Sequence, residues 1–371
     1  MDFSWENNIF GLEDNIKQWV RLGEEMEKYV IRGEASDDLD TILHTAPESL
    51  LDWIMETWNM APENVDRPGK EAMTKEVIEK TFGTNKEYMA PQVFKLFAKY
   101  EAGENMTGED MLLMWTELVE KGWGFFFMDN EGHVVPVIPK TIMDMFKRLL
   151  TDEQEKVNLS FIHFVRLTLH AFVNIFGVTE KEKIIQYVAK EFDQWDDIKE
   201  TAGYVLDNLL DTEDGVWQDK EYVISADLEN RMEYRRILRQ ARENDYFSPS
   251  YDQIEVYKDT IVDENDPRFK AMEKNIKKFT AGEEDARTLL NYIVYRVVEE
   301  DAGIGDVAAI MADSVETFPS RHTDSFMESC NDWMYYVGRW ANRGRSNAQI
   351  GKPKIGVSRQ FLSEGHKKSH L

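Results

Sequence analysis

One local pattern occurs twice in this chain and constrains its fold more than any other feature. In residues 110–146 and again in residues 196–232, a segment with helical spacing leads into a tight β-hairpin and then into another helix. The first hairpin turns through residues 129–132, and the second turns through Asp219 and Lys220. Gly, Asn and Asp between short apolar strands are typical of hairpin turns. The repeat therefore predicts two winged-helix-like modules of the form helix, β-hairpin, helix.

The segments outside the hairpins show the apolar spacing of helices, which predicts a mainly α, multi-helical fold. Loop composition and helix stops divide the chain into five predicted sections. These are an N-terminal helical section (1–66), module one (67–152), module two (153–245), a C-terminal helical section (246–343) and a basic tail (344–371).

Local signals predict several helix boundaries. Residues 3–32 have helical spacing, and Thr107 is predicted to cap a helix because an acidic residue follows three positions later. Gly83 and Gly177 are predicted to end two helices. Ser225 is predicted to cap a long polar helix that reaches residue 244.

Charge is distributed unevenly along the chain. The sequence has 70 acidic and 44 basic residues, for a net charge of −26. An acidic body repels phosphates, whereas the basic end of the chain suits RNA, a membrane surface or the acidic body itself. From residue 339 onward only Glu364 opposes the basic residues, which are Arg339, Arg343, Arg345, Lys352, Lys354, Arg359, Lys367 and Lys368.

Cysteine usage and the N-terminal segment indicate a cytoplasmic location. Cys330 is the only cysteine, so no intrachain disulfide or thiolate zinc site is predicted, and a buried packing role is expected. The acidic N-terminal stretch lacks the basic region of a signal peptide. Apolar runs such as residues 123–128 are too short to span a bilayer, so no membrane partner is expected.

Two familiar site chemistries are disfavoured by the residues. The third helix of each module, residues 107–123 and 196–215, is acidic, whereas a helix that reads DNA bases needs Arg, Lys, Asn or Gln. His163 and His170 share one helix face, but no ligand follows them at the spacing a metal requires. We therefore expect hydrogen-bonded core histidines, no metal and no cofactor.

The first hairpin strand is unusually aromatic. Trp123, Phe125 and Phe127 alternate with Gly124, Phe126 and Met128, so that the two sets face opposite sides of the strand. One set is predicted to pack on Trp115 and Leu118 of the preceding helix. The other set is expected to be covered by neighbouring helices, and the alternative is an exposed partner-binding patch.

Three passages resemble a group of bacterial proteins, best represented in Firmicutes. They are residues 122–140, residues 170–188 with 246–259, and residues 338–356. That group has helical and winged-helix-like segments and often ends in a zinc-binding SEC-C tail. Here Gly365, Lys367 and Lys368 match the end of such a tail, but its cysteines are absent. The resemblance therefore implies an architecture and a bacterial or phage origin, and it implies neither zinc nor an activity.

No catalytic motif is present, so we expect a non-enzymatic, cytoplasmic adaptor or regulatory protein whose acidic body binds a basic protein surface. Two alternatives remain open: a nucleic-acid-binding or transcription-regulatory protein, and an acidic DNA mimic that inhibits a nucleic-acid-binding protein. A cryptic enzyme would require a pocket with convergent polar groups. The oligomeric state is not predicted. The candidate interaction residues are Trp123, Phe125, Phe126, Phe127, Arg339, Arg343, Arg345, Lys352, Lys354, Lys367 and Lys368.

Overall fold

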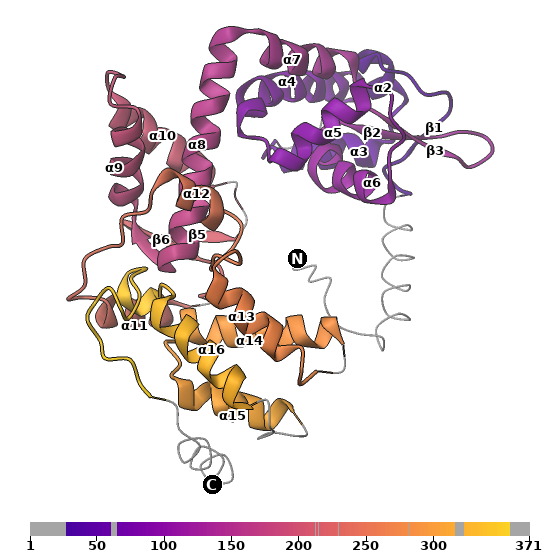
Figure 1. Ribbon diagram of the computed structural model, residues 1–371. Helices are drawn as coiled ribbons and strands as arrows, with labels where there is room; N and C mark the ends of the chain where they lie inside the picture. Colours follow the sequence, from indigo (N-terminus) through magenta and orange to yellow (C-terminus); the bar gives the residue numbers. More distant parts are fainter. Residues whose placement is uncertain are drawn as a thin grey trace. The chain divides into compact units, whose positions relative to one another are not determined.

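The structure is a computed structural model that describes residues 27–60, 65–211, 213, 215–228, 230–280, 282–315 and 323–356. The chain is mainly helical, as predicted. It forms two compact units, one ending at Ser160 and the other beginning at Phe161 (Figure 1). Each unit buries a hydrophobic core of its own.

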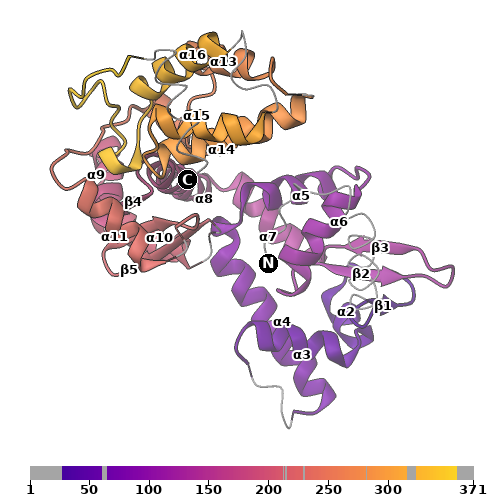
Figure 2. The same cartoon turned by 90° about the horizontal axis from the view of Figure 1, so that it is seen from below.

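The first unit surrounds a three-stranded sheet with helices. Its elements are β1 (Ile31–Arg32), α2 (Leu39–Thr45), α3 (Glu48–Thr57), α4 (Arg67–Asn85), a 3₁₀ turn (Lys86–Tyr88), α5 (Pro91–Glu101), α6 (Gly108–Met114), a π-helical turn (Trp115–Val119), β2 (Phe125–Met128), β3 (Val134–Val137), α7 (Lys140–Thr151) and the start of α8 (Glu153–Phe176). Strand β1 is parallel to β2, and β2 is antiparallel to β3. Figure 2 shows α5 and α6 on one side of the hairpin and α2 and α3 on the other.

The predicted helix 3–32 lies mostly outside the described residues, and its end is wrong. Ile31 and Arg32 form β1 instead of a helix. Ile31 is buried opposite Phe127 of β2, and the N–H of Gly33 extends the pairing by donating to the carbonyl oxygen of Met128. A two-residue strand has no period of its own, so only its pairing with a distant segment defines it.

Local capping signals define helix starts in this unit. The Thr107 hydroxyl accepts from the N–H of Asp110, and the Asp110 carboxylate accepts from the N–H of Thr107, which is the capping box expected at α6. Pro91 occupies the first turn of α5, where its missing N–H has no helical partner to lose.

Gly83 does not end a helix, contrary to the prediction. Helix α4 continues past it to Asn85. Phe82 is fully buried and its ring packs on the rings of Phe97 and Trp123. Burial of one such ring outweighs the cost of about 1 kcal/mol for Gly inside a helix.

The second unit begins within α8, which Gly177 ends with a φ of +68°, as predicted. Its next elements are β4 (Val178–Glu180), α9 (Lys181–Glu191), α10 (Ile198–Leu210), β5 (Val216–Asp219), β6 (Tyr222–Ser225) and α11 (Arg231–Gln240). Strands β4 and β5 both pair antiparallel with β6, so β6 is central in this sheet. The hairpin β5–β6 matches the prediction, but strand β4 was not predicted.

The predicted start of the long polar helix is wrong. Ser225 belongs to β6, where its N–H donates to the carbonyl oxygen of Gly177. Helix α11 begins only after Asn230, whose side chain accepts from the N–H groups of Met232 and Glu233. Both Ser and Asn are good caps, and pairing with the distant β4 region takes Ser225 into the sheet.

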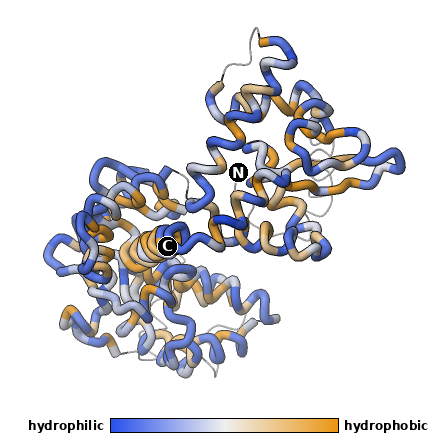
Figure 3. The backbone as a smooth tube through the Cα atoms, turned by 90° about the horizontal axis from the view of Figure 1, so that it is seen from above, coloured by the Kyte–Doolittle hydropathy of each residue, from blue (hydrophilic) through white to orange (hydrophobic). Residues whose placement is uncertain are grey.

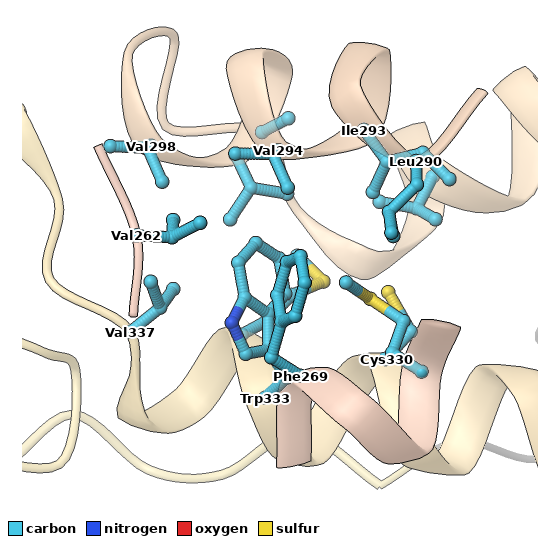
Figure 4. Packing of buried hydrophobic residues seen from close by; sticks show 14 of the residues in the cluster. Val262, Phe269, Leu290, Ile293, Val294, Val298, Cys330, Trp333 and Val337 are labelled. Atoms are coloured by element: carbon cyan, nitrogen blue, oxygen red, sulfur yellow. The ribbon is translucent and has the colours of Figure 1, made fainter. Parts of the chain in front are cut away.

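The rest of the second unit is helical. It comprises α12 (Tyr251–Tyr257), α13 (Pro267–Ile276), α14 (Glu283–Val298), α15 (Ile304–Ser314), α16 (Thr323–Tyr336) and a 3₁₀ turn (Trp340–Asn342). The rings of Phe269 and Trp333 meet edge to face with centroids 6.1 Å apart (Figure 4). Cys330 is buried in the same core, as predicted, and burial raises the pKa of its thiol to about 12.

Helix α8 corrects the expectation that no segment is long and apolar enough to cross a membrane. Among the described residues it alone passes that test of length and composition, and 61% of its apolar window is buried inside the structure. Figure 3 shows hydrophobic residues on segments inside each unit and hydrophilic residues on the outer loops. Burial of this kind is typical of the core helix of a soluble protein.

Candidate functional site

The aromatic strand β2 lies in the core of the first unit, so it is not an exposed binding patch. Trp123, Phe125, Phe126 and Phe127 are all buried. The Phe126 ring stacks on Trp115 at a centroid distance of 6.3 Å, which confirms the predicted packing on the preceding helix.

The opposite face of this strand is covered as well. The Trp123 ring meets the edge of Phe82 from α4 at 5.2 Å. Helices on both sides therefore exclude these rings from a partner, which confirms the covered arrangement and rejects the patch.

The described cations at the basic end of the chain are largely engaged by the second unit. Arg339 is buried, and its Nη1 lies 2.8 Å from Asp301 Oδ1 and donates to the carbonyl oxygen of Ala302. The Arg343 guanidinium lies over the Tyr246 ring at 4.4 Å. These two arginines hold the fold together and are not free to bind a partner.

The remaining cations of this end are nearer the surface. Arg345 is half-buried, and Lys352 is exposed with its Nζ 3.4 Å from Asn342 Oδ1. Lys354 pairs with Asp332 at 2.5 Å. Lys367 and Lys368 lie outside the described residues. The tail is thus docked as far as residue 354, and its acidic partners belong to its own unit.

Trp340 anchors this docked segment. It is fully buried, and its indole N–H donates to the carbonyl oxygen of Asn174 at 2.9 Å. A Cβ on Gly177 would come within 2.3 Å of the indole ring, so a glycine is needed where the ring crosses the end of α8. Trp340 therefore joins the start of the basic segment to the core of the second unit.

Histidines predicted to be hydrogen-bonded core residues include one member of a buried charge network. Arg166 and His170 lie one turn apart on α8, and both reach Glu213, at 2.6 Å from Arg166 Nε and 3.0 Å from His170 Nε2. Burial raises the pKa of the Glu213 carboxyl, but hydrogen bonds and charge from His170 and Arg166 outweigh it and hold the pKa below its usual range. The carboxylate stays ionised between the Arg166 guanidinium and the His170 imidazole, which ties α8 to the segment after α10. His163 is exposed and lies outside this network.

A second carboxyl group is buried without a cationic partner among the described residues. Glu299, at the end of α14, is 4% exposed. Burial, reinforced by the negative charges of Asp227 and Glu300, raises its pKa to about 9. The side chain is therefore neutral at pH 7, and folding of this unit is coupled to its protonation.

Each unit has a groove among its described residues. The groove of the first unit has a volume of about 560 Å³ and lies between α2 and α4. Its charged side chains are already paired, Lys75 with Asp40 at 2.7 Å and His44 with Glu71 at 3.5 Å. The groove of the second unit, about 220 Å³, is lined by α13 and α14 and contains Lys277 beside Glu273. Neither arrangement brings together a nucleophile, a base and a space for substrate.

The more distinctive surface lies on α10. Tyr204 is 68% exposed at the middle of this helix. Glu200, Asp207 and Asp211 are exposed at the helical spacing that places them on the same face as Tyr204. We name these four residues the acidic stripe. Asp207 pairs with Lys181 of α9 at 2.6 Å, and the stripe otherwise faces solvent.

Helix α11 of the same unit carries the opposite charge. Arg231, Arg235 and Arg239 are exposed on this helix at four-residue spacing, and Arg242 is exposed two residues after the helix ends. We name these four residues the arginine row. Met232 beside the row is 79% exposed, the highest value among large hydrophobic side chains in the described ranges. Arg231 Nε lies 3.4 Å from Asp219. No other described carboxylate lies within 4.0 Å of the row.

The acidity of residues 196–215 was predicted from the sequence, but neither helix face was identified as a candidate site. Their signals were available, since acids at 200, 207 and 211 and arginines at 231, 235, 239 and 242 follow the helical period. Exposure of Tyr204 and Met232 could not be read in the same way, because apolar residues at these positions equally suit a core. No known protein family, curated protein or solved structure matches this chain.

Proposed function

We propose that this chain is a non-enzymatic adaptor or regulatory protein that binds a basic protein surface through its second unit. The observation that carries the proposal is Tyr204, exposed at the centre of the acidic stripe. Interfaces commonly consist of an aromatic anchor within a polar or charged rim, and Tyr is enriched among residues that contribute most to binding. A basic partner is the one that the surrounding carboxylates attract.

The order of elements in the second unit supports a winged-helix-like interpretation of the module. A helix, a short strand, two helices and a hairpin follow one another as α8, β4, α9, α10 and β5–β6, and β4 pairs with β6. In such a module α10 takes the place of the helix that enters a DNA groove. The carboxylates of the acidic stripe oppose phosphate there, so we propose a protein surface as its target.

Nucleic-acid binding through the tail has less support. Arg339 and Arg343, two of the expected cations, are held by Asp301 and Tyr246. A retardation assay should shorten the chain only after residue 356, because an earlier cut would remove the segment that Trp340 anchors. Charge mimicry of DNA would use the same acidic surface and differs in requiring competition with DNA for one target.

Affinity capture with matched variants tests the proposal. The tagged full chain, its Tyr204→Ser variant and a Tyr292→Ser control are each incubated with lysate of the source cell and eluted by a salt gradient. Tyr292 on α14 is also exposed, at 46%, and so controls for loss of a surface tyrosine. We expect basic proteins that the wild type and the control retain and that Tyr204→Ser loses. Identical protein sets for all three chains would contradict the proposal.

A further inference from the structure

The arginine row of α11 and the acidic stripe of α10 are complementary in charge and in spacing. On each helix, residues four apart lie about 6 Å apart along the axis. Each face also presents one strongly exposed apolar side chain, Met232 on α11 and Tyr204 on α10. These two are the most exposed large hydrophobic residues that the structure describes.

Few contacts within the chain occupy the arginine row. Arg231 reaches Asp219, and Arg239 Nε donates to the carbonyl oxygen of Arg235 at 3.3 Å within the same helix. The Arg235 guanidinium lies 5.9 Å from the centre of the Tyr234 ring and interacts with the charge of Asp219. Among the described residues no carboxylate pairs with Arg235, Arg239 or Arg242. In a chain of net charge −26, a row of arginines with so few internal partners indicates a surface selected for an external one.

We propose that the arginine row of one molecule docks on the acidic stripe of a second copy of this chain. This inference rests on the proposed function, since it names the partner of the acidic stripe. The two surfaces differ, so the contact is heterologous, and each copy retains one free stripe and one free row. Assembly then proceeds head to tail.

The apolar anchors and the charges have separate roles in this contact. Met232 and Tyr204 lose water on docking, which supplies most of the affinity, whereas exposed ion pairs contribute little each. The charges instead set the register and exclude the reversed pairing. A contact limited to two short helix faces is small, and it is consistent with weak, reversible association.

A second copy fits the arginine row better than a nucleic acid does. The helical part of the row, from Arg231 to Arg239, spans about 12 Å. Exposed acids, Asp227 before the row and Glu243 and Asp245 after it, interrupt any longer basic track. A polyphosphate chain crossing the row would meet those carboxylates at both ends. An acidic helix face of similar length meets only the arginines.

Ionic strength gives the contact a distinct signature. At about 0.01 M salt the Debye length is about 30 Å, so two copies repel through their whole negative charge. Near 0.15 M it is about 8 Å, and only the facing groups interact. High salt screens these as well. We therefore expect association to be strongest at intermediate salt and weaker on both sides, whereas binding of a polyphosphate weakens steadily with salt.

Sedimentation velocity of the full-length chain, with charge-reversal variants, tests the inference. The row variant is Arg235→Glu with Arg239→Glu, and the stripe variant is Glu200→Lys with Asp211→Lys. Each alone should lose association by at least about tenfold in Kd. An equimolar mixture should regain it, because the unaltered stripe of the row variant then meets the unaltered row of the stripe variant, and the two reversed faces are also opposite in charge.

Control pairs of equal charge change lie on exposed positions of the first unit and should leave association unchanged. They are Lys95→Glu with Arg148→Glu, and Glu104→Lys with Glu109→Lys. Circular dichroism melts check that every variant folds. If the row variant does not fold, the neutral pair Arg235→Gln with Arg239→Gln replaces it, and this pair is expected to weaken association less.

Three results would overturn the inference. They are a wild-type chain that stays monomeric at every salt concentration, association that survives both reversals, and a mixture that fails to regain it. Binding of a labelled single- or double-stranded oligonucleotide that the row variant loses, without self-association, would assign the row to nucleic acid instead. A monomeric wild type that still captures basic proteins through Tyr204 would leave the proposed function standing.

Discussion

The β2–β3 hairpin of the first unit and the β5–β6 hairpin of the second follow similar orders of elements but differ in which strand is central. In the first unit β1 joins the first hairpin strand, and in the second unit β4 joins the second hairpin strand. The central strand is the apolar one in both cases. β2 reads Phe-Phe-Phe-Met and β6 reads Tyr-Val-Ile-Ser, whereas the edge strands β3 and β5 are partly exposed.

In both units the third strand joins the more apolar strand of the hairpin. A strand with neighbours on both edges, covered on both faces, must be apolar throughout. An edge strand tolerates Pro136 in β3 and Gln218 in β5 because one side of it meets solvent. The hairpin of the first unit is therefore core, and that of the second is partly surface.

The largest effect should come from the central strand of the first unit. Phe126→Ala removes a buried ring that stacks on Trp115, and we expect a loss of about 3–5 kcal/mol in the free energy of unfolding. Gln218→Ala on the exposed edge strand of the second unit should change it by less than about 0.5 kcal/mol. Hydrogen exchange with mass spectrometry measures each unit separately, as is needed when two units can unfold independently. Equal effects for the two substitutions would remove the distinction between the hairpins.

The next-largest difference between the units should be in the pH dependence of their stability, because the second unit buries the titratable side chain of Glu299. An unfolded Glu ionises near pH 4.5, whereas folded Glu299 has a pKa of about 9. Between these values the folded state binds a proton that the unfolded state lacks, so stability falls as pH rises, by up to about 1.4 kcal/mol per unit. At pH 7 the cost is about 3 kcal/mol, which Glu299→Gln should largely remove.

Exchange rates measured from pH 5 to 9, corrected for intrinsic exchange, check this prediction. The second unit of the wild type should lose protection with rising pH, the variant should lose less, and the first unit serves as internal reference. Parallel pH profiles for wild type and variant would show that Glu299 is not the group responsible.

The smallest expected difference between the units is in the free energy of unfolding that a helix cap contributes. The capping box at α6 uses a carboxylate, Asp110, which also pairs with Lys99, whereas that at α12 uses the neutral Gln253 with Ser250. Hydrogen bonds to charged groups are roughly twice as strong. Thr107→Ala should therefore cost about 1–2 kcal/mol and Ser250→Ala about 0.5–1 kcal/mol, measured by urea unfolding at constant pH. A larger cost for Ser250→Ala would contradict this ranking.

Features set by neighbours along the chain could be predicted from the sequence. The cap at Thr107, the stop at Gly177 and both hairpins depend on residues within a few positions, and all were correct. Strands β1 and β4 were missed because each is short and defined by pairing with a distant segment. Ser225 was misassigned for the same reason, since its partner Gly177 precedes it by many residues.

The surfaces also divide into features that nearby residues determine and features that only the folded chain shows. Charges of the acidic stripe and the arginine row are visible in the helical period, but only the folded chain shows which apolar residue each face exposes. The basic end of the chain was expected to bind a partner or to fold back. Its engagement depends on Trp340, and nothing near that residue in sequence identifies Asn174 and Gly177 as its neighbours.

The contact of Trp340 with the end of α8 has a consequence for the order in which the protein is made. The indole and its acceptor at Asn174 are 166 residues apart in sequence. During synthesis the end of α8 emerges long before the ring that covers it, and at about 5–20 residues per second the delay is roughly 10–30 s. Throughout that interval Trp340 does not yet cover Gly177 at the end of α8. The second unit therefore completes this part of its core only after Trp340 has left the ribosome.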